Sequence, residues 1–271
     1  MGCSLLLVGC GKMGGAMLDG WFAARTVDDV VVVEPQGAFG ADAPSGEHRI
    51  VRCAGPSRIP PGFDPDVVVF AVKPQVMDEV VPAYAAFARP GTVFLSIAAG
   101  KPIGYFAGRL GAEAAIVRAM PNTPAAVGRG MTVAVPSAAV TEEQRRLCDT
   151  LLGAVGQVAW VEDEGLLDAV TAVSGGGPAY VFLLIETLAK AGVAAGLPED
   201  LSMRIARATV AGSGELAMRS AEPASVLRRN VTSPNGTTQA ALEVLMAGDG
   251  MQPLFDRAIA AATARSRQLA G

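Results

Sequence analysis

The first part of the chain alternates short, continuously apolar runs with segments of helical periodicity. Runs rich in Val, Ile and Leu are typical of strands buried on both faces of a sheet. They occupy residues 4–8, 29–34, 66–72, 92–97, 115–120 and 131–135, and residues 157–161 are expected to form a last edge strand. Helical segments are expected at 15–23, 76–87 and 103–110. Strands that alternate with helices predict a parallel sheet covered by helices on both faces.

From about residue 162 the pattern changes, because no further β-branched run occurs. Apolar positions at helical spacing predict helices at 164–173, 178–195, 198–218, 223–230, 237–247 and 252–269. Pro178, Pro198 and Pro223 stand in the first turns of three of them, where proline is favoured. We therefore predict an α/β domain over residues 1–161 and an all-α domain over residues 162–271.

The helix predicted at 178–195 is apolar nearly all round. Such a helix must be buried on every side, which a helical domain of this size does not readily achieve alone. Burial against a second copy of the chain solves the problem, so we predict a homodimer formed through the all-α domain.

Composition excludes several classes of function. Among 271 residues the net charge is −4, and no cluster of Lys and Arg offers a face for nucleic acid. His48 is the only histidine and the four cysteines form no CxxC pair, which argues against histidine-dependent catalysis and against a metal site. Scattered thiols are typical of a reduced, cytoplasmic protein. No segment reaches the roughly 20 uninterrupted apolar residues of a membrane span.

A glycine-rich turn follows the first predicted strand. Gly9, Gly11 and Gly14 form GxGxxG, in which the first glycine permits the turn, the second admits a diphosphate and the third lets helix and strand pack closely. The helix that follows offers unpaired N–H groups to the phosphates. The second strand ends at Glu34, whose carboxylate could accept hydrogen bonds from ribose hydroxyls and would repel a 2′-phosphate. The spacing from Gly9 to Glu34 is longer than the usual distance of about 20 residues. The alternative is that Glu34 is only an exposed acid at the end of a strand. The sequence thus predicts a bound dinucleotide, and Glu34 by itself favours NADH over NADPH.

Five segments taken in order resemble the pyrroline-5-carboxylate reductase family. They are GCGKMG (9–14), AVKPQ (71–75), MPNTP (120–124), DAVTAVSGGGPAY (168–180) and VTSPNGTT (231–238), and they span essentially the whole chain. The resemblance implies a Rossmann-like N-terminal domain, a helical dimerisation domain, and reduction of 1-pyrroline-5-carboxylate to L-proline, the last step of proline biosynthesis, with NAD(P)H.

The resemblance also implies which segments border the ligands. On the cofactor side these are Gly9, Gly11, Lys12, Met13, Gly14, Glu34, Ala71, Val72, Lys73, Pro74 and Asn122. On the substrate side they are Ser174, Gly175, Gly176, Gly177, Pro178, Ser233, Gly236, Thr237 and Thr238. Two positions depart from the family pattern: Gly176 replaces a serine, and Asn235 replaces a glycine whose left-handed backbone Asn tolerates.

The proposed chemistry is transfer of hydride to an imine carbon, which requires orientation rather than a metal or a nucleophile. The turn before the helix at 237 offers N–H groups at Gly236, Thr237 and Thr238 to the substrate carboxylate. The alternative is that a threonine there only forms the N-cap of an ordinary helix. Thr238 is the candidate contact of the imine nitrogen. Glu222 either holds the iminium or its water, or only complements a helix dipole.

Two alternatives differ in class. The first is another two-domain NAD(P)-dependent reductase, acting on a related cyclic imine or on a β-hydroxyacid. A β-hydroxyacid dehydrogenase would carry a lysine one turn after the glycine-rich break, whereas the first lysine after this break is Lys190. A dinucleotide sensor without catalysis would bind cofactor tightly and show no turnover.

Overall fold

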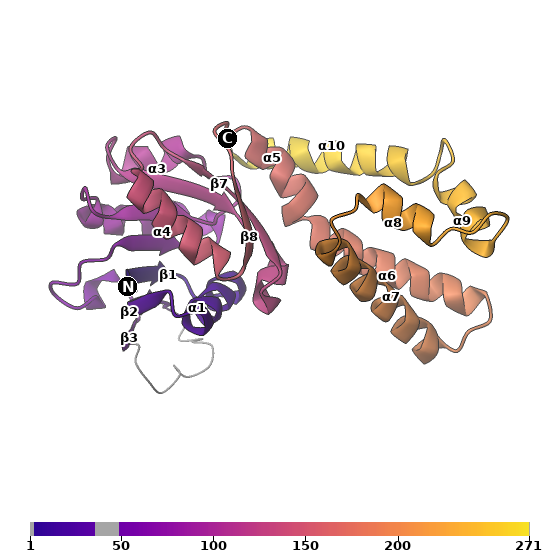
Figure 1. Ribbon diagram of the computed structural model, residues 1–271. Helices are drawn as coiled ribbons and strands as arrows, with labels where there is room; N and C mark the ends of the chain where they lie inside the picture. The colour runs from indigo at the N-terminus through magenta and orange to yellow at the C-terminus, as the bar shows by residue number, and fades with distance from the viewer. Residues whose placement is uncertain (1–2, 36–48, 271) are drawn as a thin grey trace. The chain divides into compact units, whose positions relative to one another are not determined.

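The computed structural model describes residues 3–35 and 49–270, and its first unit is built on a single sheet (Figure 1). Within the described residues, eight strands are ordered β3-β2-β1-β4-β5-β6-β7-β8. Their bounds are β1 Cys3–Val8, β2 Val27–Val33, β3 Arg49–Cys53, β4 Val67–Phe70, β5 Val93–Ser96, β6 Ala115–Met120, β7 Gly130–Pro136 and β8 Gly156–Trp160. Strands β1 to β6 are parallel, and the order reverses between β1 and β4. In such sheets the crevice at the carboxyl ends of the two switch strands is the usual ligand site.

The expectation of a wholly parallel sheet is wrong for the last two strands, β7 and β8, which run opposite to β1–β6. β7 pairs antiparallel with β6, and β8 then runs parallel to β7. Only the residues between Met120 and Gly130 connect β6 to β7, and they hold a short 3-10 helix, Thr123–Val127. A parallel return requires a crossover of a dozen or more residues, so a connection this short forces the chain to reverse direction.

Alternate residues of the strands build two separate cores, one on each face of the sheet. Leu5 and Leu7 of β1 pack with helices α1 (Lys12–Ala24) and α4 (Glu142–Gly153). Leu6 and Val8 pack with α2 (Met77–Val80) and α3 (Ile103–Leu110) on the opposite face. The period of two along each strand produces this division, and both faces are covered as predicted.

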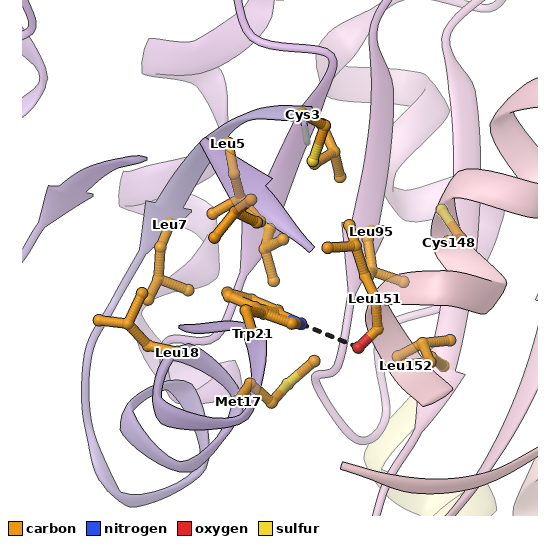
Figure 2. Packing of buried hydrophobic residues seen from close by; sticks show 14 of the residues in the cluster. Cys3, Leu5, Leu7, Met17, Leu18, Trp21, Leu95, Cys148, Leu151 and Leu152 are labelled. Atoms are coloured by element: carbon orange, nitrogen blue, oxygen red, sulfur yellow. Dashed lines mark hydrogen bonds between the residues drawn. The ribbon is translucent and has the colours of Figure 1, made fainter. Parts of the chain in front are cut away.

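Trp21 lies at the centre of the first core (Figure 2). It is fully buried, and its indole Nε1–H donates to the Leu151 carbonyl over 2.8 Å, which joins α1 to α4. A buried indole N–H without a hydrogen-bond partner lowers the stability of the fold. This bond therefore allows the largest side chain of the core to be buried without that penalty.

Three local elements differ from the pattern-based expectations. Strand β3 lies in the stretch that shows no clear periodicity, and α4 was not expected, although Thr141 and Gln144 form a capping box at its start. The helix expected at 76–87 is only the single turn α2 between 3-10 segments. Pro82 explains this, since it has no N–H to continue an α-helical ladder.

The chain divides into two compact units, Met1–Gly175 with Thr263–Gly271, and Gly176–Ala262. The change in sequence pattern near residue 162 follows the last strand, β8, and the compact units divide after Gly175. Helices of the remaining chain are α5 Leu166–Val170, α6 Gly177–Ala194, α7 Glu199–Arg219, α8 Ala224–Asn230, α9 Thr237–Leu245 and α10 Met251–Ala270. In the second unit α6 and α7 pack closely, and the Ser202 hydroxyl donates to the Ala189 carbonyl over 2.7 Å.

One helical stretch, Leu166–Ala194, is long and apolar enough by length and composition to cross a membrane, and only 6% of its most apolar window is buried within the chain. The core helix of a soluble protein passes the same test. The stretch contains α6, for which burial on every side was expected. In the single chain only Ala189 of α6 is buried.

Candidate functional site

The glycine-rich turn has the form that the sequence predicts, and each glycine has its own physical reason. Gly9 has φ +91°, and a Cβ there would lie 2.6 Å from Val72 Cγ1. A Cβ on Gly14 would lie 2.5 Å from the Gly9 carbonyl oxygen. A Cβ on Gly11 would meet nothing within 4 Å. Gly9 and Gly14 are therefore required by the protein's own packing, whereas nothing in the protein requires Gly11 to be bare.

The start of α1 fits a diphosphate. Gly11 is the N-cap and provides no side-chain cap, and the first turn carries no acid. The first N–H groups of a helix have no intrahelical acceptor, and the helix dipole adds partial positive charge there. Lys12 is exposed at this end, while the half-buried Met13 side chain packs against the core. Lys12 can therefore approach a phosphate with its side chain, and Met13 can do so only with its backbone.

Glu34 lies against the same turn despite its longer spacing. Its carboxylate Oε2 accepts a hydrogen bond from the Cys10 N–H over 2.9 Å, and its own N–H donates to the Cys53 carbonyl. The carboxylate thus places a negative charge beside the turn, as a ribose-binding acid would, and it also holds the turn in shape. The contact with Cys10 could not be foreseen from the sequence.

The segment after β4 forms the neighbouring wall of the turn. The Ala71 N–H donates to the Val8 carbonyl over 2.8 Å, and Val72 is the residue that closes on Gly9. Lys73 is exposed with φ −62° and ψ 143°, the extended form expected before proline, and Pro74 begins a 3-10 helix. Ala71 and Val72 shape the turn, whereas the Lys73 side chain is available to a ligand.

Asn122 follows β6 and binds other parts of the protein. Its Oδ1 accepts from the Met131 N–H over 2.9 Å. Its Nδ2 donates to Ser174 twice, to the carbonyl oxygen over 3.3 Å and to Oγ over 3.2 Å. The side-chain amide expected to border the cofactor therefore joins the end of β6 to the start of β7 and to the SGGGP segment.

The SGGGP segment is not a simple helix break. Residues Thr171–Gly175 form a π-helical turn between α5 and α6, and Gly176 is the N-cap of α6, with Pro178 in its first turn as predicted. A Cβ on Gly175 would lie 2.5 Å from Met120 Cε. Single π-turns inside helices are frequent at functional sites.

The second helix start lies in the other unit, at α9. Asn235 has φ +57°, so it adopts the left-handed backbone expected of a glycine substitute. Gly236 is the N-cap, its N–H donates to the Ser233 carbonyl over 3.1 Å, and a Cβ on it would collide with Ser233 Oγ. The turn thus uses the Gly236 N–H itself, which leaves Thr237 and Thr238 as the expected backbone donors.

The alternative interpretation of this helix start as a Thr N-cap does not hold, because Gly236 occupies that position without a side-chain cap. Ser233, Thr237 and Thr238 are exposed in the single chain. Glu222 precedes α8, and its Oε2 accepts from Asn230 Nδ2 over 3.2 Å. The Glu222 carboxylate is therefore held by the far end of the short helix that follows it.

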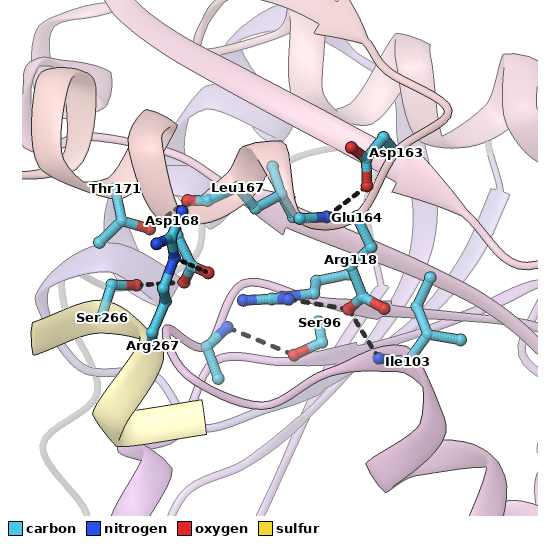
Figure 3. Close-up of polar contacts among 12 residues, drawn as sticks. Ser96, Ile103, Arg118, Asp163, Glu164, Leu167, Asp168, Thr171, Ser266 and Arg267 are labelled. Atoms are coloured by element: carbon cyan, nitrogen blue, oxygen red, sulfur yellow. Dashed lines mark hydrogen bonds and ion pairs between the residues drawn. The ribbon is translucent and has the colours of Figure 1, made fainter. Parts of the chain in front are cut away.

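A polar cluster that the sequence analysis missed anchors α5, the helix before the π-turn (Figure 3). Arg118 of β6 is 6% exposed, and its guanidinium lies 2.8 Å from Glu164 Oε1, which also accepts the Ile103 N–H. Asp168 of α5 accepts from Ser266 Oγ over 2.7 Å. An arginine in a strand otherwise made of apolar residues is the signal that could have revealed a buried partner.

In the described parts of the chain, 3–35 and 49–270, no three His, Cys, Asp or Glu residues gather as metal ligands. His48 lies outside the described residues.

Two family models match the chain. Residues 164–269 match pyrroline-5-carboxylate reductase dimerisation, and residues 4–100 match NADP oxidoreductase coenzyme F420-dependent. Pyrroline-5-carboxylate reductase of Pseudomonas aeruginosa is 37% identical over 98% of this chain and 96% of its own, and that of Synechocystis is 38% identical over 99% of both.

Solved structures agree with these relatives over the full length. A pyrroline-5-carboxylate reductase from Coxiella burnetii superposes with a TM-score of 0.88 at 29% identity and covers 100% of both chains. The Plasmodium falciparum pyrroline carboxylate reductase with NADP bound has a TM-score of 0.80 at 27% identity, over 99% of this chain and 98% of its own. The glycine turn, the helix start at 237 and the likeness over the whole length lead to one conclusion: the chain belongs to the pyrroline-5-carboxylate reductase family.

Proposed function

We propose that the protein reduces 1-pyrroline-5-carboxylate to L-proline with NADPH or NADH, as an oxidoreductase of proline biosynthesis. The observation that carries the proposal is the glycine turn, in which Gly9 and Gly14 are held by packing and Gly11 is left bare beside an uncapped helix start. A turn needed only for structure would not need the bare Gly11. The pyrroline-5-carboxylate reductase of Pseudomonas aeruginosa, which matches 98% of the chain, supports the proposal.

The dinucleotide is assigned to the ends of β1 and β4. The N–H groups at the start of α1 bind the diphosphate, Lys12 and Lys73 supply positive charge, and Glu34 faces the ribose. A bound reduced nicotinamide supplies the hydride. Glu34 adds a negative charge that works against a 2′-phosphate, so the charge-neutral variant Glu34→Gln is expected to shift cofactor preference toward NADPH.

The substrate carboxylate is assigned to the start of α9. Thr237 and Thr238 donate their N–H groups, and the Ser233 and Thr hydroxyls add further donors. Thr238 Oγ1 donates toward the imine nitrogen, which becomes more basic as hydride reaches the adjacent carbon. Glu222, whose carboxylate accepts from Asn230, holds the iminium form of the substrate directly or through a water molecule.

We infer a homodimer formed through the helical part of the chain, in the cytoplasm. Phe182 and Leu183 of α6 remain 58% and 60% exposed in the single chain, a degree of apolar exposure that marks an interaction surface. The functional division is placed at residues 1–161 for the dinucleotide and 162–271 for substrate and dimerisation. The dimerisation model, matched over 164–269, supports this placement.

The test is the oxidation of NADPH and NADH by the purified protein on addition of 1-pyrroline-5-carboxylate, with proline quantified as product. Thr238→Ala is expected to lower kcat about tenfold or more, whereas Thr238→Ser, which keeps the hydroxyl, retains most of it. Tight cofactor binding without proline formation would instead identify a dinucleotide sensor. Equal kcat for wild type and Thr238→Ala would remove Thr238 from the mechanism.

A further inference from the structure

The Asn122 side chain is bound to the protein through both of its polar atoms. Its amide makes three hydrogen bonds, one accepted from Met131 and two donated to Ser174. An Asn side chain has two N–H donors, and both Ser174 contacts draw on them. These contacts account for the amide without any ligand.

The Ser174 carbonyl has lost the donors that a helix would ordinarily provide. In an α-helix the carbonyl of Ser174 would accept from residue 178, but that residue is Pro178, which has no N–H. In a continued π-helix it would accept from Ala179, but the Ala179 N–H donates to the Gly176 carbonyl over 3.0 Å. The Asn122 Nδ2 supplies a donor at this carbonyl in their place.

A second contact holds the same point. Met120, two residues before Asn122, packs its side chain so closely on Gly175 that a Cβ there would lie 2.5 Å from Met120 Cε. The residues at the end of β6 therefore meet the end of the π-turn through one polar and one apolar contact. The two contacts fall on Ser174 and Gly175, the first two residues of SGGGP.

We propose that Asn122 is a positioning residue: its side-chain amide replaces the helix donor that Pro178 removes and so fixes the Ser174–Gly175 backbone at the end of β6. Because the amide is committed to Ser174 and Met131, it acts on the reaction through that backbone and does not bind the dinucleotide. The catalytic part of this inference rests on the proposed function; the structural part does not.

Two variants isolate the donor. Asn122→Asp keeps the acceptor for the Met131 N–H and loses the donor to Ser174, whereas Asn122→Ala loses both. Loss of the hydrogen bond to the Ser174 carbonyl alone, worth about 1 kcal/mol, predicts backbone amide exchange at residues 171–175 at least about fivefold faster in Asn122→Asp, with the rest of the sheet unit unchanged. In turnover, kcat falls by a similar factor or more, while the dissociation constant for NADPH or NADH stays within about twofold.

Three results would overturn the proposal. Wild-type exchange rates at 171–175 in Asn122→Asp would show that the donor does not hold the turn. A large increase in the cofactor dissociation constant with unchanged exchange would make Asn122 a cofactor ligand. Rapid exchange of the Asn122 side-chain amide protons in wild-type protein, measured by NMR, would contradict the hydrogen bonds without any variant having to fold. Failure of pyrroline-5-carboxylate turnover in wild type would instead refute the proposed function and leave the exchange results standing.

Discussion

The sheet unit and the helical unit both contain runs of consecutive apolar residues, but these runs are buried to very different degrees. The four residues of β4, Val67–Phe70, are all 0% exposed. In α6, by contrast, four consecutive apolar residues, Val181–Leu184, are between 40% and 60% exposed. The sheet unit supplies the partners for its own apolar surface, since each strand is covered on both faces. The helical unit does not, and the comparison indicates that its fold is completed by another chain.

The largest expected effect tests the surface of α6. Phe182→Asp with Leu183→Asp places two charges on it and is expected to weaken dimerisation about a thousandfold, at about 2 kcal/mol for each site. Sedimentation velocity over a concentration series measures the change. Val127→Asp, at a 75% exposed apolar position of the sheet unit, is the matched control and should leave the assembly unchanged. If the double variant keeps the wild-type assembly, the exposed face of α6 is not the interface.

Within the sheet unit the sharpest contrast is between two glycines of one turn. Gly9→Ala combines a left-handed backbone with a collision at Val72 and is expected to cost about 3 kcal/mol of unfolding free energy. Gly11→Ala meets open space, so its stability should stay within about 0.5 kcal/mol of wild type. Urea denaturation and cofactor titration measure the two effects separately. Gly11→Ala binding cofactor as tightly as wild type would contradict the assigned diphosphate site.

The Arg118–Glu164 pair is expected to have an intermediate effect. Glu164→Gln leaves Arg118 buried beside a neutral partner, and we expect a loss of about 2 kcal/mol, below the roughly 3–5 kcal/mol of a fully buried pair because the Glu164 side chain is 30% exposed. Arg118→Met leaves only the more exposed carboxylate and should cost less. Equilibrium unfolding of both variants measures the two losses of unfolding free energy. An equal loss in both variants, or a larger loss in Arg118→Met, would refute the prediction.

The smallest effect concerns buried thiols of the sheet unit. Burial raises the pKa of Cys3 and of Cys148 from 9.0 to about 12. A thiol that binds its proton more tightly in the fold contributes its full stability below pH 9 and loses it as pH rises toward 12. The expected loss is at most about 1.4 kcal/mol per thiol at pH 10.

Unfolding free energies at pH 8 and pH 10, compared between wild type and Cys3→Ala with Cys148→Ala, measure this loss. The same pH dependence in both proteins would show that other groups are responsible.

Apart from β3, the strands of the sheet unit were predictable because their residues form largely apolar runs, and three of the helix starts were predictable because proline marks them. The antiparallel β7 was not, since direction depends on the length of a connection rather than on the composition of a strand. Strand β3 lies at the sheet edge, and Arg49 and Arg52 interrupt its apolar pattern. The glycine turn could be predicted residue by residue, because its constraints are local.

The contacts of Glu34 with Cys10 and of Asn122 with Ser174 join residues far apart in the chain. The local sequence around Glu34 and Asn122 does not indicate these contacts, so sequence reasoning assigned both side chains to a ligand. The geometry gives both a protein partner. Sequence reasoning therefore located the site by its backbone and could not anticipate which side chains stabilise it.

The final residues, Thr263–Gly271, belong to the sheet unit although they follow the helical unit in the chain. A Cβ on Gly100 would lie 3.1 Å from the Leu269 carbonyl oxygen, and Ser266 binds Asp168. A gene cut after residue 175 would therefore yield a fragment that lacks roughly the last two turns of α10, which belong to its own unit. A fragment meant to contain the whole sheet unit should therefore join residues 263–271 to residues 1–175. A stop codon near residue 262 would remove part of the sheet unit and leave the helical unit complete.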